Sequence, residues 1–275
     1  MNPLTAALII VLAVVVTVAV MLVARRYGRS GGRFTDSDRA SGPFGFVGVG
    51  FVILLGFIIA LSFGTYDNAA TQSEAEGVAV VEQFAAAEDM PLGLRNRAQA
   101  DLVCYARSVV GPDWEAMKSG GASPVTEHWI TELEQTGIAL PAANSKQSDA
   151  LIAWNEATKE RELGRRARLL VAQGEVPTLL WVLLVIAGLM VIGYVLLYAD
   201  PDEGVVAQVA MMASTAALVA ASLVAVAVLA SPFQNEEGSI KPTGMKYSIS
   251  VIQADLAAER RTLPILCNAN GNPRS

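Results

Sequence analysis

Hydrophobic residues are concentrated in four long stretches that contain no charged side chain. These stretches run from Leu4 to Val23, Gly42 to Tyr66, Val176 to Ala199 and Val205 to Ala230. A helix needs roughly 20 such residues to cross the hydrocarbon layer of a bilayer. The pattern therefore predicts four membrane-spanning helices, at residues 4–23, 43–65, 177–198 and 205–230.

The segments outside the spans carry a helical pattern. Apolar residues after Asp67 continue at helical spacing, and no proline interrupts the chain from Phe46 to Met90, so the second span is expected to continue as one helix past the membrane. Further helices are expected from Pro91 to about Gly111-Pro112, from Val125 to Thr136, from Ser148 to Gln173 and from Lys246 to Arg260.

These elements predict an all-α membrane protein with a helical soluble domain inserted between spans two and three. Its parts are a membrane hairpin at 1–66 with an Arg-rich loop at 24–42, the soluble domain at 67–176, a second membrane hairpin at 177–230 and a soluble tail with one helix at 231–275. No alternating pattern long enough for a convincing strand occurs in the soluble domain.

Charge distribution indicates the orientation in the membrane. Five arginines between Arg25 and Arg39 place the first loop in the cytoplasm, which puts the N-terminus, the middle domain and the tail outside. The opposing evidence is basic residues at the other ends of the spans: Lys159, Arg161, Arg165, Arg166 and Arg168 before the third, with Lys241 and Lys246 after the fourth. The charges of the middle segment count less because that segment is long. The first span is expected to be kept as an anchor, since no basic residue precedes it and it exceeds a signal h-region.

Other polar residues have ordinary interpretations. Glu74, Glu76 and Glu82 are typical of a solvated helix face, although carboxylates repeated in an oligomer can also form a ring at a pore mouth. Glu162 is spaced to pair with Arg165 and Arg166 on another solvated face. Cys104 and Cys267 lie in the two segments expected on the same side, where they either pair or remain buried thiols.

Composition and motifs exclude several function classes. The net charge of −6 argues against nucleic-acid binding, which needs a basic footprint. His128 is the single histidine, without nearby cysteine, and zinc, nucleotide-phosphate and nucleophile-elbow motifs are absent from the sequence. We therefore predict no catalytic, cofactor-binding or metal residues, no cofactor, and a protein that is not an enzyme.

Membrane transport is the remaining chemistry. The spans contain no ionisable side chain, which disfavours proton pumps and ion-coupled carriers but not a passive pore with a hydrophobic gate. Ile53, Phe57 and Phe63 in the second span are the candidate constriction, and the glycines at 45, 48, 50 and 56 allow close helix approach. Lipid contact and helix packing explain the same residues. Ala213, Ala217, Ala221 and Ala225 in the fourth span predict close packing within the bundle or between subunits.

Four segments together resemble the bacterial bestrophin-like family of membrane proteins. They are GFVGVGFVILLGFIIALSFGTYDNAATQSEAEGVAVVEQF from Gly45, LVCYARSVVGPDWEAM, RRARLLVAQGEVPTLLW and the SPF after the fourth span. Tyr66-Asp67 replaces a frequent Trp-Glu of that family, and Ala230-Ser231 replaces a frequent Asp-Arg. The resemblance covers most of the chain and implies four spans with a helical insertion.

The resemblance also implies a function. Bestrophins assemble as oligomeric chloride channels lined by their second span, with the soluble part in the cytoplasm, which conflicts with the orientation expected from the first loop. The first hypothesis is an oligomeric passive ion channel in the bilayer. The second is a non-conducting scaffold whose helical domain binds a protein partner, and a sensor of an extracytoplasmic ligand is a third.

Overall fold

The computed structural model describes residues 2–27, 37–174, 176–234 and 238–274, without the side chains of 37–41. These residues form helices and turns, and the β-type pairing described among them is one isolated bridge between Cys267 and Pro273. They divide into two compact units. Unit 1 comprises Met1–Gly64, Glu175–Ser231 and Glu236–Gly238, and unit 2 comprises Thr65–Gly174, Pro232–Asn235 and Ser239–Ser275.

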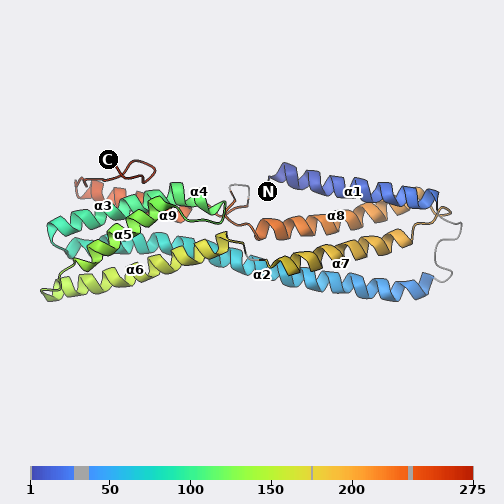
Figure 1. The fold of residues 1–275 in the computed structure, drawn as a ribbon, viewed down its shortest axis with the longest axis horizontal. Coiled ribbons are helices and arrows are strands. Elements are labelled where there is room, and N and C mark those ends of the chain that lie inside the picture. Colours follow the sequence, from blue (N-terminus) through green and yellow to red (C-terminus); the bar gives the residue numbers. More distant parts are fainter. Residues whose placement is uncertain (1, 28–36, 175, 235–237, 275) are drawn as a thin grey trace. The chain divides into compact units, whose positions relative to one another are not determined.

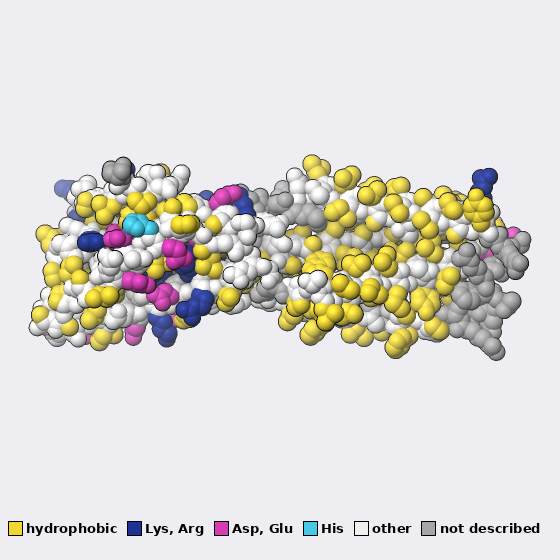
Figure 2. Space-filling view, viewed as in Figure 1, with side chains coloured by type: hydrophobic (Ala, Val, Ile, Leu, Met, Phe, Trp, Pro, Cys, Tyr) yellow, Lys and Arg dark blue, Asp and Glu magenta, His cyan; other side chains and the backbone are white. Residues whose placement is uncertain are grey.

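Unit 1 contains the four predicted spans. They are α1 (Pro3–Arg26), the first part of α2 (Ser37–Ala86), α7 (Thr178–Leu197) and α8 (Val205–Leu229). All four helices are long and apolar enough to cross a membrane. Figure 1 shows α8 between α1 and α7, and Figure 2 shows hydrophobic side chains covering the visible face of this unit. The prediction of a four-span, all-α membrane protein is confirmed.

Two apolar clusters hold the spans of unit 1 together. Met21 of α1 packs with Val195 of α7 and Met212 of α8. Phe51, Leu55 and Ile58 of α2 pack with four buried residues of α7 and α8, which are Leu184, Val191, Val219 and Val226. These contacts fix which face of α2 is turned toward the other spans.

Helix α2 is one uninterrupted helix of 50 residues that contributes to both units. At 1.5 Å per residue it is about 75 Å long, more than twice the hydrocarbon thickness of a bilayer. The prediction that the second span continues as a helix is therefore confirmed.

Unit 2 is a helical bundle. It contains the second part of α2, η1 (Ala87–Asp89), α3 (Leu92–Ser108), α4 (Trp114–Met117), α5 (Pro124–Ile138), α6 (Ser145–Ala172) and α9 (Thr243–Ala258). Local sequence explains two of the helix starts. Ser123 accepts a hydrogen bond from the Val125 amide ahead of Pro124, and Asn144 accepts one from the Gln147 amide.

One predicted helix end is wrong. The helix starting at Leu92 was expected to end near Gly111-Pro112, but the chain continues through a π-helical turn, Val109–Asp113, directly into α4. The wider turn accommodates Pro112, which has no N–H to donate to the preceding turn. As a result Asp113 and Trp114 enter the core of unit 2, where both are buried.

Candidate functional site

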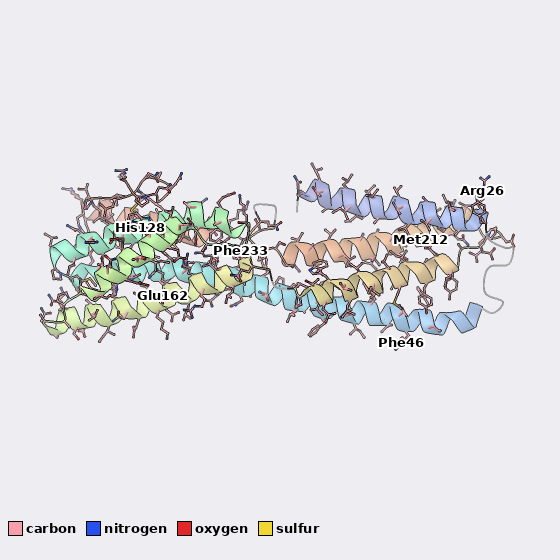
Figure 3. The ribbon with its side chains drawn as sticks, viewed as in Figure 1. Arg26, Phe46, His128, Glu162, Met212 and Phe233 are labelled. Atoms are coloured by element: carbon pink, nitrogen blue, oxygen red, sulfur yellow. A yellow bond between two sulfur atoms is a disulfide. The ribbon has the colours of Figure 1, made fainter. Side chains whose placement is uncertain are left out.

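The membrane part of α2 has a second face that meets no other helix of the described chain. The side chains of Ile53 and Phe57 are 67% and 65% exposed. They are four residues apart, so they lie on one side of the helix, one turn from each other. Phe46, labelled in Figure 3, belongs to the same stripe and is also exposed.

Phe63 lies on the flank of this stripe. It is also exposed, but it follows Phe57 by six residues, which turns its side chain about 120° around the helix axis. The structure therefore places Ile53 and Phe57 together and Phe63 to one side.

The glycines of α2 are open as well. A Cβ atom built on Gly45, Gly48, Gly50 or Gly56 would meet nothing within 4 Å among the described residues. Within the single chain these glycines do not serve the close helix approach that the sequence indicates. The close approach in this unit is at Gly188 of α7, where a Cβ would lie 2.8 Å from Cγ1 of Val219 on α8.

The alanine row of α8 is only partly covered. Ala213 and Ala217 are half-buried, whereas Ala221 and Ala225 are exposed. The buried positions of α8 include Ala216 instead, next to this row. Within one chain the row therefore forms the edge of the α8 contact and not its centre.

Arg25, in the last turn of α1, binds the turn between α7 and α8 and the start of α8. Its Nη1 donates to Oε1 of Gln208 at 2.6 Å, and its Nη2 donates to the carbonyls of Pro201 and Glu203 at 3.0 and 2.8 Å. The end of α1 and the turn between α7 and α8 therefore lie at the same end of unit 1.

Unit 2 contains a buried cluster of charges centred on Arg168. Nε and Nη2 of Arg168 donate to the two carboxylate oxygens of Glu76 at 2.8 and 3.0 Å, and Nη1 donates to Asp113 at 2.9 Å. All three side chains are buried. Burial lowers the pKa of Arg168, but the two carboxylates outweigh it and raise this pKa overall. The pairs join α6, α2 and the π-helical turn.

Two further groups complete the cluster. The hydroxyl of Tyr105 donates to Glu76 at 2.6 Å, and burial together with that carboxylate raises the pKa of Tyr105. Arg165 donates to Asp113 at 3.4 Å and to Glu127 at 2.9 Å. These contacts are those of a structural crosslink, because every carboxylate in the cluster is already paired with arginine.

Three sequence interpretations are corrected by this cluster. Glu76 is buried and not on a solvated face, whereas Glu74 and Glu82 are exposed as expected. Arg165 is also buried, and it pairs with Asp113 and Glu127 instead of Glu162. The basic residues Arg161, Arg165 and Arg168 are core residues of unit 2, so they are not free charges beside the third span.

Asp101 is a buried acid that the sequence interpretation missed. It accepts a hydrogen bond from the Thr136 hydroxyl at 3.4 Å, and its Oδ1 has no partner among the described residues. Burial raises its pKa to about 6, against the opposing effect of Arg97. Its position among the buried residues of α3 was the available signal.

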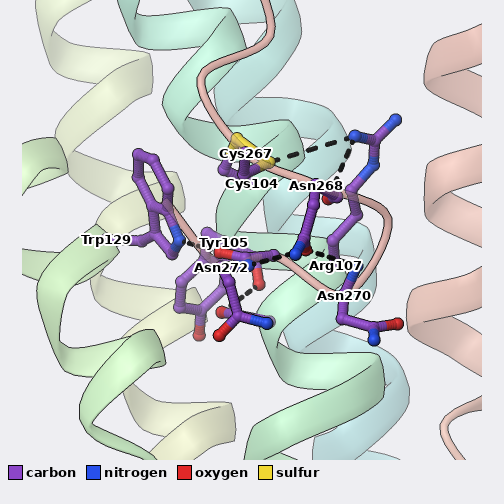
Figure 4. The surroundings of a disulfide bond; sticks show 10 residues. Cys104, Tyr105, Arg107, Trp129, Cys267, Asn268, Asn270 and Asn272 are labelled. Atoms are coloured by element: carbon purple, nitrogen blue, oxygen red, sulfur yellow. Dashed lines mark hydrogen bonds between the residues drawn. A yellow bond between two sulfur atoms is a disulfide. The ribbon is translucent and has the colours of Figure 1, made fainter. Parts of the chain in front are cut away.

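Cys104 and Cys267 form a disulfide (Figure 4). The interpretation as two separate buried thiols is therefore excluded. The bond attaches the segment after α9 to α3, and Trp129 Nε1 donates to the carbonyl of Gly271 in the same segment at 2.6 Å. Gly271 has a φ of +79°, and a Cβ there would lie 2.4 Å from the Ser108 nitrogen, so glycine is required at this close approach.

The described residues offer no metal-binding group of three or more His, Cys, Asp or Glu. His128 is exposed, and its ring lies 4.8 Å from that of Trp129, as expected for a surface packing residue.

Comparison with known proteins decides the family. The sequence matches the Bestrophin-like domain over residues 11–243, which include the middle segment and most of all four spans. The chain belongs to the Bestrophin-like family. This match confirms the resemblance to the bestrophin-like family that the sequence indicates. None of the curated proteins matches it in sequence.

Solved structures show the same Bestrophin-like fold. A bacterial bestrophin homologue from Klebsiella pneumoniae has a TM-score of 0.67 at 14% identity, covering 90% of this chain and 98% of that one. A structure described only as that of a membrane protein, in a single-residue variant, has a TM-score of 0.69 at 14% identity, again covering 90% and 98%. At these identities the likeness concerns the fold.

Proposed function

We propose that this protein assembles into an oligomer that forms a passive ion pathway lined by α2. The observation that carries the proposal is the open stripe of α2, where Ile53 and Phe57 are two-thirds exposed and the neighbouring glycines meet no other part of the described chain. The family membership supports the proposal, since the resemblance to bestrophins implies oligomeric channels lined by the second span.

The chemistry of the stripe is that of a hydrophobic gate. No charged residue occurs from Gly42 to Tyr66, so the pathway has no group that would couple transport to protonation. Copies of Ile53 and Phe57 around an axis would form two apolar rings, one helical turn apart. Such rings control conduction by wetting and dewetting. The open glycines leave room for neighbouring copies of α2 to approach closely.

The proposal includes an orientation with unit 2 outside the cytoplasm. The Cys104–Cys267 disulfide supports it, because such bonds persist in oxidising compartments. Three of the arginines that opposed this orientation, Arg161, Arg165 and Arg168, are buried in unit 2, which leaves Lys159 and Arg166 as the exposed basic residues before the third span. Arg25 lies at the short-loop end of the spans, where the positive-inside tendency expects basic residues.

Ion flux through liposomes tests the pathway. Purified wild-type protein is expected to conduct, and Phe57→Ala is expected to raise or deregulate the flux because it removes one apolar ring. Leu189→Ala is the matched control, since Leu189 is an equally exposed apolar residue of α7. Unchanged flux in Phe57→Ala, or an equal effect of both substitutions, would count against lining by α2. Absence of flux in a folded protein that retains a soluble partner would favour the scaffold.

Alkaline phosphatase fusions test the orientation. A fusion after Arg274 is expected to be active, because the enzyme folds only in an oxidising compartment. A fusion after Asp202, in the turn between α7 and α8, is expected to be inactive. The reverse pattern would overturn the proposed orientation while leaving the flux experiment unaffected.

A further inference from the structure

A cavity of about 280 Å³ lies in unit 2, between the second part of α2, the π-helical turn with Trp114, and the segment that leads into α9. Its apolar floor is formed by four buried side chains, which are Val109, Trp114, Ile240 and Met245. Cavities that bind small organic molecules begin at roughly this size and combine an apolar wall with a few charged or polar groups.

The two charged residues of the wall are Glu74 on α2 and Lys241 ahead of α9. Both side chains are exposed, so a dissolved molecule can reach their charged ends. Neither has an ion-pair or hydrogen-bond partner for its side chain within the described part of the chain, and they do not pair with each other. One cavity therefore carries two opposite charges, from two different elements, that the protein leaves without partners.

Each charge lies beside groups that reinforce its polarity. The Ser73 hydroxyl donates to the carbonyl of Ala69 at 2.7 Å, so its oxygen can still accept a hydrogen bond from a cation near Glu74. On the other side, α9 begins at Thr243 and no side chain caps it. The partial positive charge of its amino end therefore adds to that of Lys241. The cavity has one side for a cation and one side for an anion.

We propose that this cavity binds a free amino acid with an apolar side chain. The ammonium group of the ligand donates to Glu74 and Ser73, its carboxylate accepts from Lys241, and its hydrocarbon side chain covers the apolar floor. A free amino acid carries both charges on neighbouring atoms, so one ligand satisfies both sides of the cavity. An ion with a single charge would leave one side unpaired.

The site is accessible from water. Glu74 follows Tyr66, the last residue of the chargeless stretch of α2, by eight residues, or about 12 Å along the helix. All residues of the wall belong to unit 2, so the proposal is independent of ion conduction by the membrane spans.

Titration calorimetry of the full chain in an uncharged detergent tests the site, with L-leucine as the probe. Leucine is expected to bind saturably. L-leucinamide has nearly the same shape and keeps the ammonium group but lacks the carboxylate, and 4-methylpentanoate keeps the carboxylate but lacks the ammonium group. Each analogue is expected to bind at least about tenfold more weakly, because it loses the hydrogen bonds of one charged group.

Two substitutions assign the two ends of the ligand. Glu74→Gln is expected to weaken leucine and leucinamide at least about tenfold and to leave 4-methylpentanoate unchanged. Lys241→Gln is expected to weaken leucine and 4-methylpentanoate and to leave leucinamide unchanged. Glu82→Gln on α2 and Lys246→Gln on α9 are the matched controls, since both residues are exposed and lie outside the wall of the cavity. Neither control is expected to change leucine binding.

Several results would overturn the proposal. They are no saturable binding of leucine to the wild type, equal binding of leucine and its two analogues, or equal effects of the test and control substitutions. All four substituted positions are exposed, so the variants are expected to keep the Tm of the wild type and to report on binding alone.

Discussion

Replacing Gly164 by alanine tests how closely α6 crosses α2 in unit 2. A Cβ at position 164 would lie 2.7 Å from the carbonyl oxygen of Gln72 and 2.8 Å from Cβ of Glu76. Carbon atoms in contact are normally about 3.5 Å apart, so the helices would have to separate locally by about 0.7 Å. Glu76 and Arg168, which pair at 2.8 Å, belong to these two helices. The same movement would stretch their bond to about 3.5 Å, beyond hydrogen-bond range.

The expected change in the free energy of unfolding of Gly164→Ala combines opposing effects. Alanine in a helix interior gains about 1 kcal/mol over glycine, whereas overpacking costs about 1–3 kcal/mol. The weakened buried ion pair adds to that cost. We expect Gly164→Ala to reduce the free energy of unfolding by about 2 kcal/mol and to lower the Tm by roughly 4–8 °C. Helix propensity alone predicts the opposite sign.

Tryptophan fluorescence during thermal unfolding is a suitable assay. Three of the four tryptophans, Trp114, Trp129 and Trp154, belong to unit 2. Gly93→Ala is the matched control, since a Cβ on Gly93 in α3 would meet nothing within 4 Å. The control is expected to leave the Tm unchanged or slightly raised. A Gly164→Ala protein as stable as the wild type would refute the close crossing.

Three further stability predictions follow from unit 2. The double change Cys104→Ser and Cys267→Ser removes a link across 163 residues, for which chain entropy gives about 5 kcal/mol as an upper limit. We expect the free energy of unfolding to fall by about 2–4 kcal/mol, because spans three and four remain in the membrane or micelle. A reductant should lower the Tm of the wild type and not that of the double variant. Arg168→Gln removes the arginine partner of buried Glu76 and one of the two arginine partners of buried Asp113, and should lower the free energy of unfolding in urea by about 3–5 kcal/mol, against less than about 0.5 kcal/mol for the exposed Arg166→Gln. Equal losses would contradict the burial of this cluster. Burial raises the pKa of Asp101 from 3.8 to about 6, so its ionisation opposes folding increasingly as the pH rises from about 4 to 6. Asp101→Asn should therefore stabilise the protein by about 2 kcal/mol at pH 7 and by little at pH 3.5, and a gain that does not change with pH would contradict this assignment.

The membrane part of the fold could be predicted because lipid imposes a simple rule. A span must lack charge over about 20 residues, and that requirement is visible in one sequence. The continuation of α2 was also visible, since no proline interrupts it. The π-helical turn at Val109–Asp113 was not, because Gly111-Pro112 is an ordinary helix-ending signal and its outcome depends on packing.

The buried charges could have been found from their register. Glu76 lies between Ala69, Val80 and Gln83 at helical spacing, and all four are buried. Arg161 and Arg168 likewise follow Trp154 on the buried face of α6. Charged side chains are almost never fully buried unless they are paired, and this general rule favoured a solvated face over the helical spacing. The disulfide depends on contact between residues 163 positions apart, which spacing in the sequence cannot show.

Thiol accessibility at position 57 tests the central claim, that α2 lines an ion pathway, most directly. Both native cysteines are in the disulfide, so Phe57→Cys introduces the single free thiol of the chain. A charged, water-soluble methanethiosulfonate reagent is expected to change ion flux in liposomes containing Phe57→Cys. It is expected to leave unchanged the flux of Leu189→Cys, the exposed control on α7. A conducting Phe57→Cys protein that the reagent does not affect, or equal effects at both positions, would contradict the account.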